Sequence, residues 1–214
     1  MNEIKAVLFD MDGVLIDARE WHYEAMNRAL ALLGYEITRY EHLTTFDGLP
    51  TARKLQMLTV ERGLPAELHA FINSLKQQYT LELVATRCKP VFHHEFALAR
   101  LKESGYRMGV ASNSVRRTVE EMMQRSNLLG YLDFMISNED VTHPKPDPEM
   151  YLLGMSRLGV TPEETLIVED NENGVRAARA SGAHVMVVAG PDDVTLDAIH
   201  HHIDRAQSRE QVAA

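Results

Sequence analysis

Two aspartates close the first apolar stretch of this chain. The run from Ala6 to Phe9 is apolar, and Asp10 and Asp12 follow it with one residue between them. In an extended backbone, side chains two residues apart point to the same side. Two neighbouring carboxylates repel each other unless a cation or a shared proton compensates. The spacing therefore indicates a metal site, or one acid acting as a base and the other as a nucleophile. A strand followed by a polar turn is the alternative interpretation.

The chain must hold these acids on regular elements, and five short apolar runs are typical of strands. Helix-patterned segments lie between the later runs, and Gly159 and Gly182 stand where helix ends are expected. Strands that alternate with helices predict an α/β fold with a parallel sheet covered on both faces. The five runs are Ile4 to Phe9, Arg107 to Ala111, Phe134 to Ser137, Thr165 to Val168 and His184 to Val188.

Residues 16–86 break this alternation. They contain no convincing strand and three helix-like stretches, 18–33, 51–62 and 65–84, with Thr51 expected as the N-cap of the second. About seventy helical residues between two strands exceed any ordinary crossover connection. We therefore expect an inserted helical cap domain at 16–86 and an α/β core formed by 1–15 and 87–214.

Polar residues follow four of the predicted strands. Asp10 and Asp12 follow the first, Ser112 and Asn113 the second, His143 to Pro148 with Lys145 lie beyond the third, and Glu169 and Asp170 follow the fourth. In open parallel sheets, ligands bind outside the carboxyl ends of the strands. Packing alone asks for nothing polar at these points, so we expect these side chains to meet at one edge of the sheet.

These side chains have a shared chemical logic. Asp10, Glu169 and Asp170 supply hard oxygen ligands, which suit Mg²⁺ better than Zn²⁺. Lys145 and Ser112 can hold the oxygens of a phosphoryl group. An ionised aspartate could then attack phosphorus and become an acyl phosphate. The second acid would protonate the leaving alkoxide and later activate water.

Four motifs occur in the order and spacing of one family. They read Asp10-Met11-Asp12-Gly13-Val14-Leu15, Ser112-Asn113-Ser114, Lys145-Pro146-Asp147-Pro148 and Val168-Glu169-Asp170-Asn171. Over nearly its whole length the chain resembles the haloacid dehalogenase-like superfamily of phosphatases, and within it the members similar to beta-phosphoglucomutase. The resemblance implies a Rossmann-like parallel sheet core with an inserted α-helical cap domain.

The resemblance also implies roles for the motif residues. The acid at position 12 favours phosphate chemistry over carbon–halogen cleavage, because true dehalogenases normally have no acid there. The implied roles are Asp10 as nucleophile and magnesium ligand, Asp12 as general acid/base with its backbone carbonyl on the metal, Ser112 and Asn113 as phosphate binders, Lys145 as charge balance, and Asp170 as magnesium ligand with Glu169 at or near the coordination shell.

The cap is expected to decide which substrate is cleaved. His22 stands where relatives carry a cap histidine, and the stretch from Phe46 to Arg53 resembles the substrate loop of the family's cap. Arg53 would contact an anion or hydroxyl groups, and Lys76 falls near another position that relatives use. A solvated surface residue is the alternative for each of the three.

The expected function is Mg²⁺-dependent hydrolysis of a small phosphorylated metabolite, a sugar phosphate or similar, through an aspartyl-phosphate. A sugar phosphomutase of the beta-phosphoglucomutase type is the alternative among enzymes. From another class, a phospho-acceptor signalling domain would carry its acceptor after a later strand and would not need the helical insert. A non-catalytic binding relative would be expected to lose one acid of the first pair, and this chain keeps both.

Composition limits the partners and the compartment. The 214 residues carry a formal net charge of -9, which argues against a nucleic-acid surface. One cysteine, Cys88, allows no intramolecular disulfide, so a reducing compartment is expected. The sequence shows no signal-peptide pattern and no apolar run near the ~20 residues of a membrane helix. We expect a cytoplasmic protein with no membrane partner, a monomer or a weak homo-oligomer.

Overall fold

The computed structural model describes residues 3–213, and the chain divides into two compact units. One unit, which we call the core unit, joins the first 17 residues to the chain from Lys89 onward. Residues Ala18–Cys88 form the other, which we call the helical unit. The interpretation of residues 16–86 as a cap domain stays a prediction.

The core unit contains a five-stranded, wholly parallel sheet, which confirms the predicted α/β fold. The strand order is β3-β2-β1-β4-β5. All four residues of β1 are buried, as expected for a central strand with helices on both faces. The strands are β1 (Ala6–Phe9), β2 (Arg107–Ala111), β3 (Phe134–Ile136), β4 (Thr165–Glu169) and β5 (His184–Val187).

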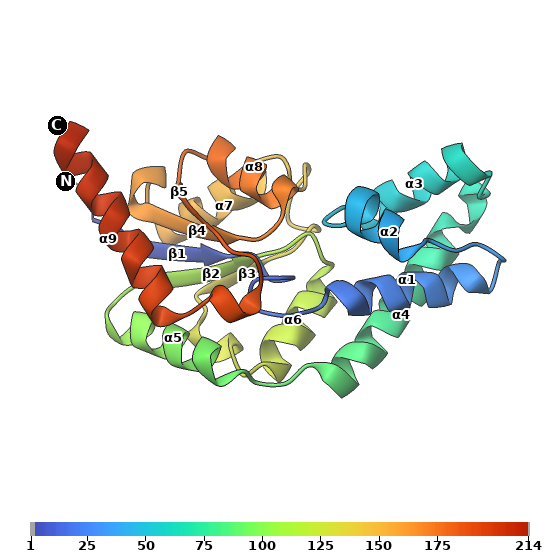
Figure 1. Ribbon diagram of the computed structural model, residues 1–214, viewed down its shortest axis with the longest axis horizontal. Coiled ribbons are helices and arrows are strands. Elements are labelled where there is room, and N and C mark those ends of the chain that lie inside the picture. Colours follow the sequence, from blue (N-terminus) through green and yellow to red (C-terminus); the bar gives the residue numbers. More distant parts are fainter. Residues whose placement is uncertain (1–2, 214) are drawn as a thin grey trace. The chain divides into compact units, whose positions relative to one another are not determined.

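Helices follow the strands and cover the sheet. In Figure 1, α7 and α8 lie on one side of the sheet and α5 lies on the other. Helix α7 contacts β1, β2 and β3, while α8 contacts β4 and β5. The helices of this unit are α5 (Phe92–Glu103), α6 (Arg116–Arg125), α7 (Glu149–Leu158), α8 (Glu172–Ala180) and α9 (Leu196–Ala213), with single 3₁₀ turns at Leu129–Tyr131, Pro162–Glu164 and Pro191–Asp193.

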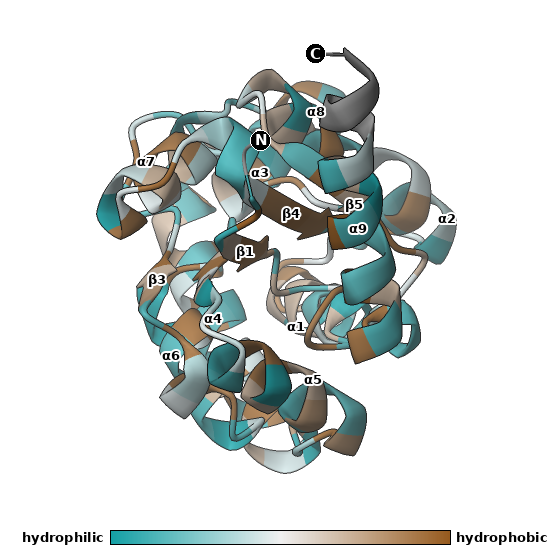
Figure 2. Cartoon of the chain, turned by 90° about the vertical axis from the view of Figure 1, so that its left-hand side faces the viewer, coloured by the Kyte–Doolittle hydropathy of each residue, from teal (hydrophilic) through white to brown (hydrophobic). Residues whose placement is uncertain are grey.

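A hydrophobic core lies between the sheet and helices α7 and α8. Leu8 and Ile167 from the two central strands pack with Tyr151 of α7 and Ala177 of α8, and all four are fully buried. Figure 2 shows β1 and β4 as hydrophobic strands. This packing fixes the carboxyl ends of the strands in a rigid frame.

The strand order contains one point at which the chain reverses its direction across the sheet. From β1 the chain proceeds to β2 and β3 on one side, and then returns to place β4 and β5 on the other side. Connections leave β1 and β4 in opposite directions, which opens a crevice outside their carboxyl ends. Ligands bind at such a point in open α/β sheets, so the residues that follow β1 and β4 are the first place to look for a site.

The helical unit has a hydrophobic core of its own. Helix α1 packs against α4, and Leu30, Phe46, Leu58 and Ile72 are buried among the side chains of this unit. Its elements are α1 (Arg19–Ala31), α2 (Arg39–Glu41), a π-helical turn at His42–Phe46, α3 (Thr51–Arg62), a 3₁₀ turn at Ala66–Leu68, and α4 (His69–Arg87).

Two details of this unit differ from the sequence expectation. Thr51 is the first residue of α3 rather than its N-cap; Pro50 occupies the cap position and no side chain caps the helix. The ring of Pro50 restricts φ to -58°, which directs the chain into the helix without a capping hydroxyl. The short helix after Thr38, which begins with a capping box to Glu41, was not predicted from the sequence.

Among the described residues, no helix combines the length and the apolar character that crossing a membrane requires.

Candidate active site

The chain turns sharply as it leaves β1. The amide of Asp10 still donates to the carbonyl of Val168 at 3.0 Å, so Asp10 continues the pairing with β4. The carbonyl of Met11 then accepts from the amide of Ile16 at 2.9 Å, and Gly13 donates to the carbonyl of Ile16 at 2.7 Å. Gly13 has a φ of +90°, a conformation that glycine adopts without strain. This turn keeps both aspartates at the end of the sheet.

Three carboxylates gather beside that turn. Asp10, Glu169 and Asp170 each offer an oxygen, and these oxygens lie within 4.8 Å of one another. A Cβ on Gly13 would lie 2.0 Å from Oδ2 of Asp170, so the glycine backbone leaves the space that this carboxylate occupies. A set of hard carboxylate oxygens at this spacing fits a Mg²⁺ ion.

The ammonium group of Lys145 lies against this cluster. Its Nζ donates to Oδ1 of Asp10 at 2.6 Å, to Oε1 of Glu169 at 2.7 Å and to the carbonyl of Ala111 at 2.8 Å. These bonds use the three N–H donors of an ammonium group. Lys145, Asp10 and Glu169 are all buried. Because one ammonium cannot balance three ionised carboxylates, the cluster still favours a cation.

Burial and charge shift the pKa values at this cluster in opposite directions. Burial raises the pKa of Asp10 well above its usual range; Lys145 opposes the rise, while Glu169 and Asp170 add to it. Burial by itself would lower the pKa of Lys145, but Asp10 and Glu169 together raise it above its usual value. A bound cation would favour the ionised form of Asp10, since an opposite charge stabilises a carboxylate.

Hydroxyl groups from the end of β2 hold the second aspartate. Ser114 Oγ donates to Oδ2 of Asp12 at 3.0 Å, and Ser112 Oγ donates to the same oxygen at 3.4 Å. The amide of Ser114 in turn donates to Ser112 Oγ at 3.0 Å. Asn113, between the two serines, exchanges two hydrogen bonds with the backbone of Lys145. The structure therefore links the ends of β1 and β2 with the Lys145 loop.

The start of α8 fixes the two acids at the end of β4; Glu169 is the last residue of the strand, rather than following it as expected, and Asp170 comes next. Asn171 is the N-cap of this helix, and its Oδ1 accepts from the amide of Gly174 at 3.0 Å. Its Nδ2 donates to Oδ1 of Asp170 at 3.1 Å, and the amide of Asp170 donates to Oε2 of Glu169 at 3.1 Å. The side-chain amide of Asn171 therefore has two roles: its oxygen caps α8, and its nitrogen orients the carboxylate of Asp170.

Three further residues of this site, Tyr151, Gly174 and Ser114, had no role assigned from the sequence. The hydroxyl of Tyr151 donates to Oε1 of Glu169, and a Cβ on Gly174 would lie 1.9 to 2.2 Å from the carboxylate of Glu169. From the sequence, an aromatic residue in the apolar pattern of a helix reads as core packing. Ser114 is the last residue of the second motif, and Gly174 lies three residues after the fourth motif. Their positions in or near these motifs are the sequence features that could have indicated a role at the site.

The three predicted cap residues all lie in the helical unit. His22 Nδ1 and Lys76 Nζ are 3.3 Å apart, and Lys76 is buried. Arg53 is exposed on the first turn of α3, where its guanidinium donates to Gln56 at 3.5 Å. The structure therefore brings His22 and Lys76 together, and it leaves Arg53 on the surface of this unit. Their roles with a substrate stay predictions.

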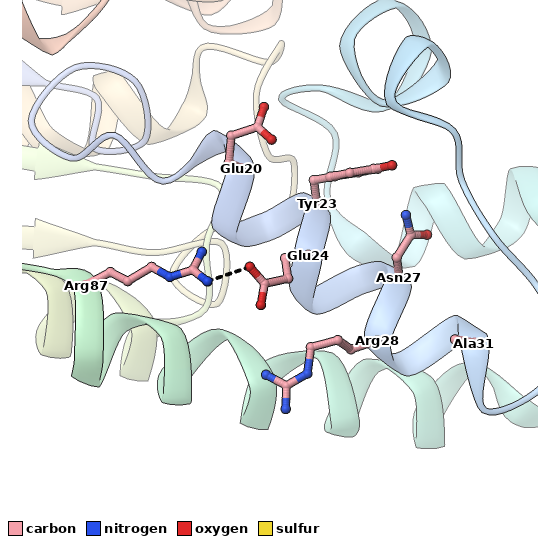
Figure 3. A pocket seen from close by; sticks show the side chains of 7 residues that line it. All are labelled: Glu20, Tyr23, Glu24, Asn27, Arg28, Ala31 and Arg87. Atoms are coloured by element: carbon pink, nitrogen blue, oxygen red, sulfur yellow. Dashed lines mark ion pairs between the residues drawn. The ribbon is translucent and has the colours of Figure 1, made fainter.

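A pocket in the helical unit is a separate feature, lined by α1 and the end of α4 (Figure 3). Figure 3 shows Arg87 directed at Glu24, to which it is paired at 2.8 Å. Asn27 exchanges two hydrogen bonds with the backbone of Ile37, at 2.7 and 2.8 Å. These polar groups serve the packing of the unit, so we do not assign the pocket a catalytic role.

Comparison with known proteins identifies the family. A family model described as haloacid dehalogenase-like hydrolase matches residues 7–188. This range includes Asp10, Lys145, Glu169 and Asp170. The chain belongs to this family. Among curated relatives of this hydrolase is a phosphorylated carbohydrates phosphatase from Thermotoga maritima, 32% identical over 182 residues, with 84% of this chain and 82% of the relative covered.

Solved structures agree on the fold of this haloacid dehalogenase-like hydrolase. CbbY from Rhodobacter sphaeroides, in complex with phosphate, matches with a TM-score of 0.80 and 26% identity over 87% of each chain. Beta-phosphoglucomutase from Clostridium difficile matches with a TM-score of 0.82 over 94% of this chain and 98% of that chain; at 19% identity it supports the fold alone.

Proposed function

We propose that this protein is a Mg²⁺-dependent phosphatase that hydrolyses a small phosphorylated metabolite, a sugar phosphate or similar, through an aspartyl-phosphate on Asp10. The observation that carries the proposal is the cluster of Asp10, Lys145, Glu169 and Asp170 at the point where the strand order reverses. A relative that is 32% identical is a phosphorylated carbohydrates phosphatase, which supports this substrate class.

In the first step, a carboxylate oxygen of Asp10 attacks phosphorus as the bond from phosphorus to the leaving oxygen breaks. Asp12 donates a proton to that leaving oxygen, so the metabolite departs as a neutral alcohol. Lys145 keeps Asp10 oriented through its hydrogen bond of 2.6 Å to Oδ1. The second carboxylate is held one residue beyond Met11 by the turn and by the two serine hydroxyls.

In the second step, Asp12 takes a proton from water, and the water oxygen attacks the phosphorus of the acyl phosphate. The bond between phosphorus and Asp10 breaks, which releases inorganic phosphate and restores the carboxylate. Ser112 is proposed to donate to a phosphoryl oxygen when substrate binds; its hydroxyl, which donates to Oδ2 of Asp12 at 3.4 Å, supports this proposal. Asn113 is proposed as a further phosphate contact, through its backbone or its amide.

Asp10, Asp170 and the backbone carbonyl of Asp12 would hold the magnesium ion, with Glu169 at or near the ion. When bound, Mg²⁺ offsets the negative charge of the phosphoryl group and of these carboxylates. The donor set fits this ion, because carboxylate oxygens within 4.8 Å of one another come from Asp10, Glu169 and Asp170.

The helical unit is proposed as the cap that selects the substrate. Arg53 stands on the first turn of α3, directly after a loop that follows the π-helical turn at His42–Phe46. Turns of this kind are rare and occur often at functional sites. His22 supplies an imidazole and Lys76 an ammonium group, with 3.3 Å between Nδ1 and Nζ. This pair suits an anion or the hydroxyl groups of a sugar. We also propose that the protein is cytoplasmic and is a monomer or a weak homo-oligomer.

The test uses the purified protein with para-nitrophenyl phosphate as the probe. We expect release of phosphate that requires Mg²⁺ and stops when the ion is chelated. Asp10→Asn keeps the volume of the side chain and removes the nucleophilic carboxylate, so we expect no turnover from a folded variant. A folded Asp10→Asn protein with full activity would overturn the assignment of the nucleophile.

The product distinguishes a phosphatase from a phosphomutase. A mutase must protect its phosphoenzyme from water long enough for the substrate to turn around. We expect free phosphate from a panel of phosphorylated sugars, nucleotides and small acids. Isomerised sugar phosphate without release of phosphate would instead support the mutase.

A further inference from the structure

Tyr151 is a buried titratable residue that the proposed steps do not use. It lies in the first turn of α7 and is 0% exposed. Its hydroxyl lies on Oε1 of Glu169, and the centre of its ring is 4.7 Å from Nζ of Lys145. An ionised carboxylate can only accept hydrogen bonds, so the phenol is the donor. Burial, and next the charge of Glu169, raise the pKa of Tyr151 well above its usual value, which keeps this proton in place.

The carboxylate of Glu169 is confined from several directions. Oε1 accepts from both Tyr151 and Lys145, and Oε2 accepts from the amide of Asp170 at 3.1 Å. On another side, the backbone of Gly174 approaches so closely that a Cβ there would lie within 2.2 Å of every atom of the carboxylate group. Glu169 is 0% exposed, so solvent cannot replace a lost partner.

We infer that Tyr151 is a positioning residue, whose hydroxyl fixes Glu169 so that Lys145 remains on the nucleophile Asp10. The inference rests on the proposed function, and it assigns Tyr151 no contact with substrate. The ammonium of Lys145 donates to both Asp10 at 2.6 Å and Glu169 at 2.7 Å. A change in the orientation of Glu169 therefore affects the hydrogen bond from Lys145 to Asp10. Tyr151 also covers the ammonium with its ring, which excludes water from that side.

Removal of the hydroxyl would leave Glu169 Oε1 with one donor in a buried space. A buried charged group that loses a hydrogen bond moves to recover one. We expect Glu169 to turn toward Lys145 and to draw the ammonium away from Asp10. The nucleophile would then be less well oriented, although the phosphate-binding groups at the end of β2 would keep their places.

The experiment compares Tyr151→Phe with the wild type and with Tyr106→Phe. The Phe variant keeps the ring that packs in the core and removes one oxygen. Tyr106 is half-buried in the same unit, just before β2, at the opposite end of the strand from Ser112, so its variant is the matched control. Urea unfolding establishes that each variant is folded, and Tyr151→Met replaces Tyr151→Phe if the latter does not fold.

Two kinds of measurement are made. In the metal-free protein, ¹H–¹⁵N spectra report whether the Lys145 ammonium protons are protected from exchange with water. With saturating Mg²⁺ and para-nitrophenyl phosphate, initial rates give kcat and KM. We expect protected ammonium protons in the wild type and in Tyr106→Phe, and faster exchange in Tyr151→Phe, because the bond from Lys145 to Asp10 weakens while those to Glu169 and Ala111 remain. We also expect kcat to fall by about tenfold in Tyr151→Phe with KM nearly unchanged.

The outcomes separate this inference from the proposed function. A folded Tyr151→Phe protein that keeps both the protected Lys145 protons and the wild-type kcat would overturn the positioning role, even if its stability falls. Absence of Mg²⁺-dependent turnover in the wild type, or full activity of Asp10→Asn, would instead reject the proposed function. The ammonium spectrum stays informative in that case, because it is recorded without metal or substrate.

Discussion

Asn113 and Lys145, 32 residues apart in the chain, hold each other through two hydrogen bonds. The amide of Lys145 donates to Oδ1 of Asn113 at 3.1 Å, and Nδ2 of Asn113 donates to the carbonyl of Lys145 at 3.3 Å. The side-chain amide of Asn113, just after β2, therefore pairs with the backbone of a residue in the loop between β3 and α7, as a neighbouring strand would. This pairing places the Lys145 side chain so that its Nζ reaches Asp10.

Asn113→Ala is expected to lower kcat by about tenfold and the free energy of unfolding by about 1–3 kcal/mol, because it leaves two backbone groups of Lys145 without partners. If the amide of Asn113 instead contacts phosphate directly, KM rises on every substrate while stability changes little. Initial-rate kinetics and urea unfolding of the same preparation distinguish the two results. Unchanged kcat together with unchanged stability would contradict the anchoring role.

Gly174→Ala sets helix propensity against a steric conflict. Alanine in place of glycine inside a helix stabilises by about 1 kcal/mol when nothing opposes it. At Gly174 of α8, the added Cβ would lie 1.9 Å from Oε1 of Glu169, so the carboxylate must move. We expect the conflict to exceed the propensity gain, with lower stability and weaker binding of Mg²⁺ by isothermal titration calorimetry.

Gly130→Ala is the matched control for this substitution. A Cβ on Gly130 meets nothing within 4 Å, and this residue lies in the same unit. We expect its stability and its Mg²⁺ affinity to remain close to those of the wild type. Equal behaviour of the two alanine variants would show that Glu169 tolerates displacement.

Arg53→Ala is expected to change substrate preference more than it changes turnover of para-nitrophenyl phosphate. Arg53 is exposed in the helical unit and does not belong to the carboxylate cluster of Asp10, Glu169 and Asp170, so we expect the chemical step not to depend on it. The measurement is kcat/KM for several phosphorylated sugars and for the aryl phosphate.

Arg39→Ala provides the comparison for Arg53. Arg39 is another exposed arginine of the helical unit, paired with Glu20 at 2.9 Å in a surface ion pair that contributes little. Substitution of Arg39 should leave kcat/KM at the wild-type value for every substrate. Losses of the same size on every substrate in Arg53→Ala would count against a selective role.

His94 is expected to make the core unit less stable in mildly acidic solution. Its side chain is buried, its Nε2 bonds the carbonyl of Pro191 at 2.9 Å, and its Nδ1 has no hydrogen-bond partner among the described residues. Burial lowers the pKa of His94 below the usual 6.5. Below about pH 6.5 the unfolded chain therefore binds a proton that the folded chain does not, and stability falls as the pH falls toward the folded pKa.

The test compares urea midpoints at about pH 8 and about pH 5.5 for the wild type and His94→Gln, which keeps an N–H donor but does not titrate. The decrease between the two pH values should be smaller in His94→Gln. His201→Gln, at an exposed position of α9, should retain the full decrease. An identical decrease of the urea midpoint in all three proteins would show that His94 does not cause the loss of stability.

The strands could be predicted because a buried parallel strand is a short apolar run with polar residues directly after it. The predicted run from Arg107 to Ala111 is the observed β2, and the run from Ile4 to Phe9 contains β1 with two residues to spare. Ile4 is buried but precedes the ladder, so its apolar character reports packing rather than strand pairing. The start of α3 was assigned with the wrong cap, since Pro50 restrains the backbone without a hydroxyl.

The amino-acid sequence by itself determined the alternation of strands and helices, the helical insert and the order of the acids, serine and lysine, because periodicity and motif spacing are local properties of the chain. Tertiary structure decided what each side chain contacts. It placed Tyr151 on Glu169, Ser114 on Asp12 and the amide of Asn113 on the backbone of Lys145. Those contacts join residues that are distant in the sequence, and they form only when the sheet brings the ends of its strands together, so no local pattern encodes them.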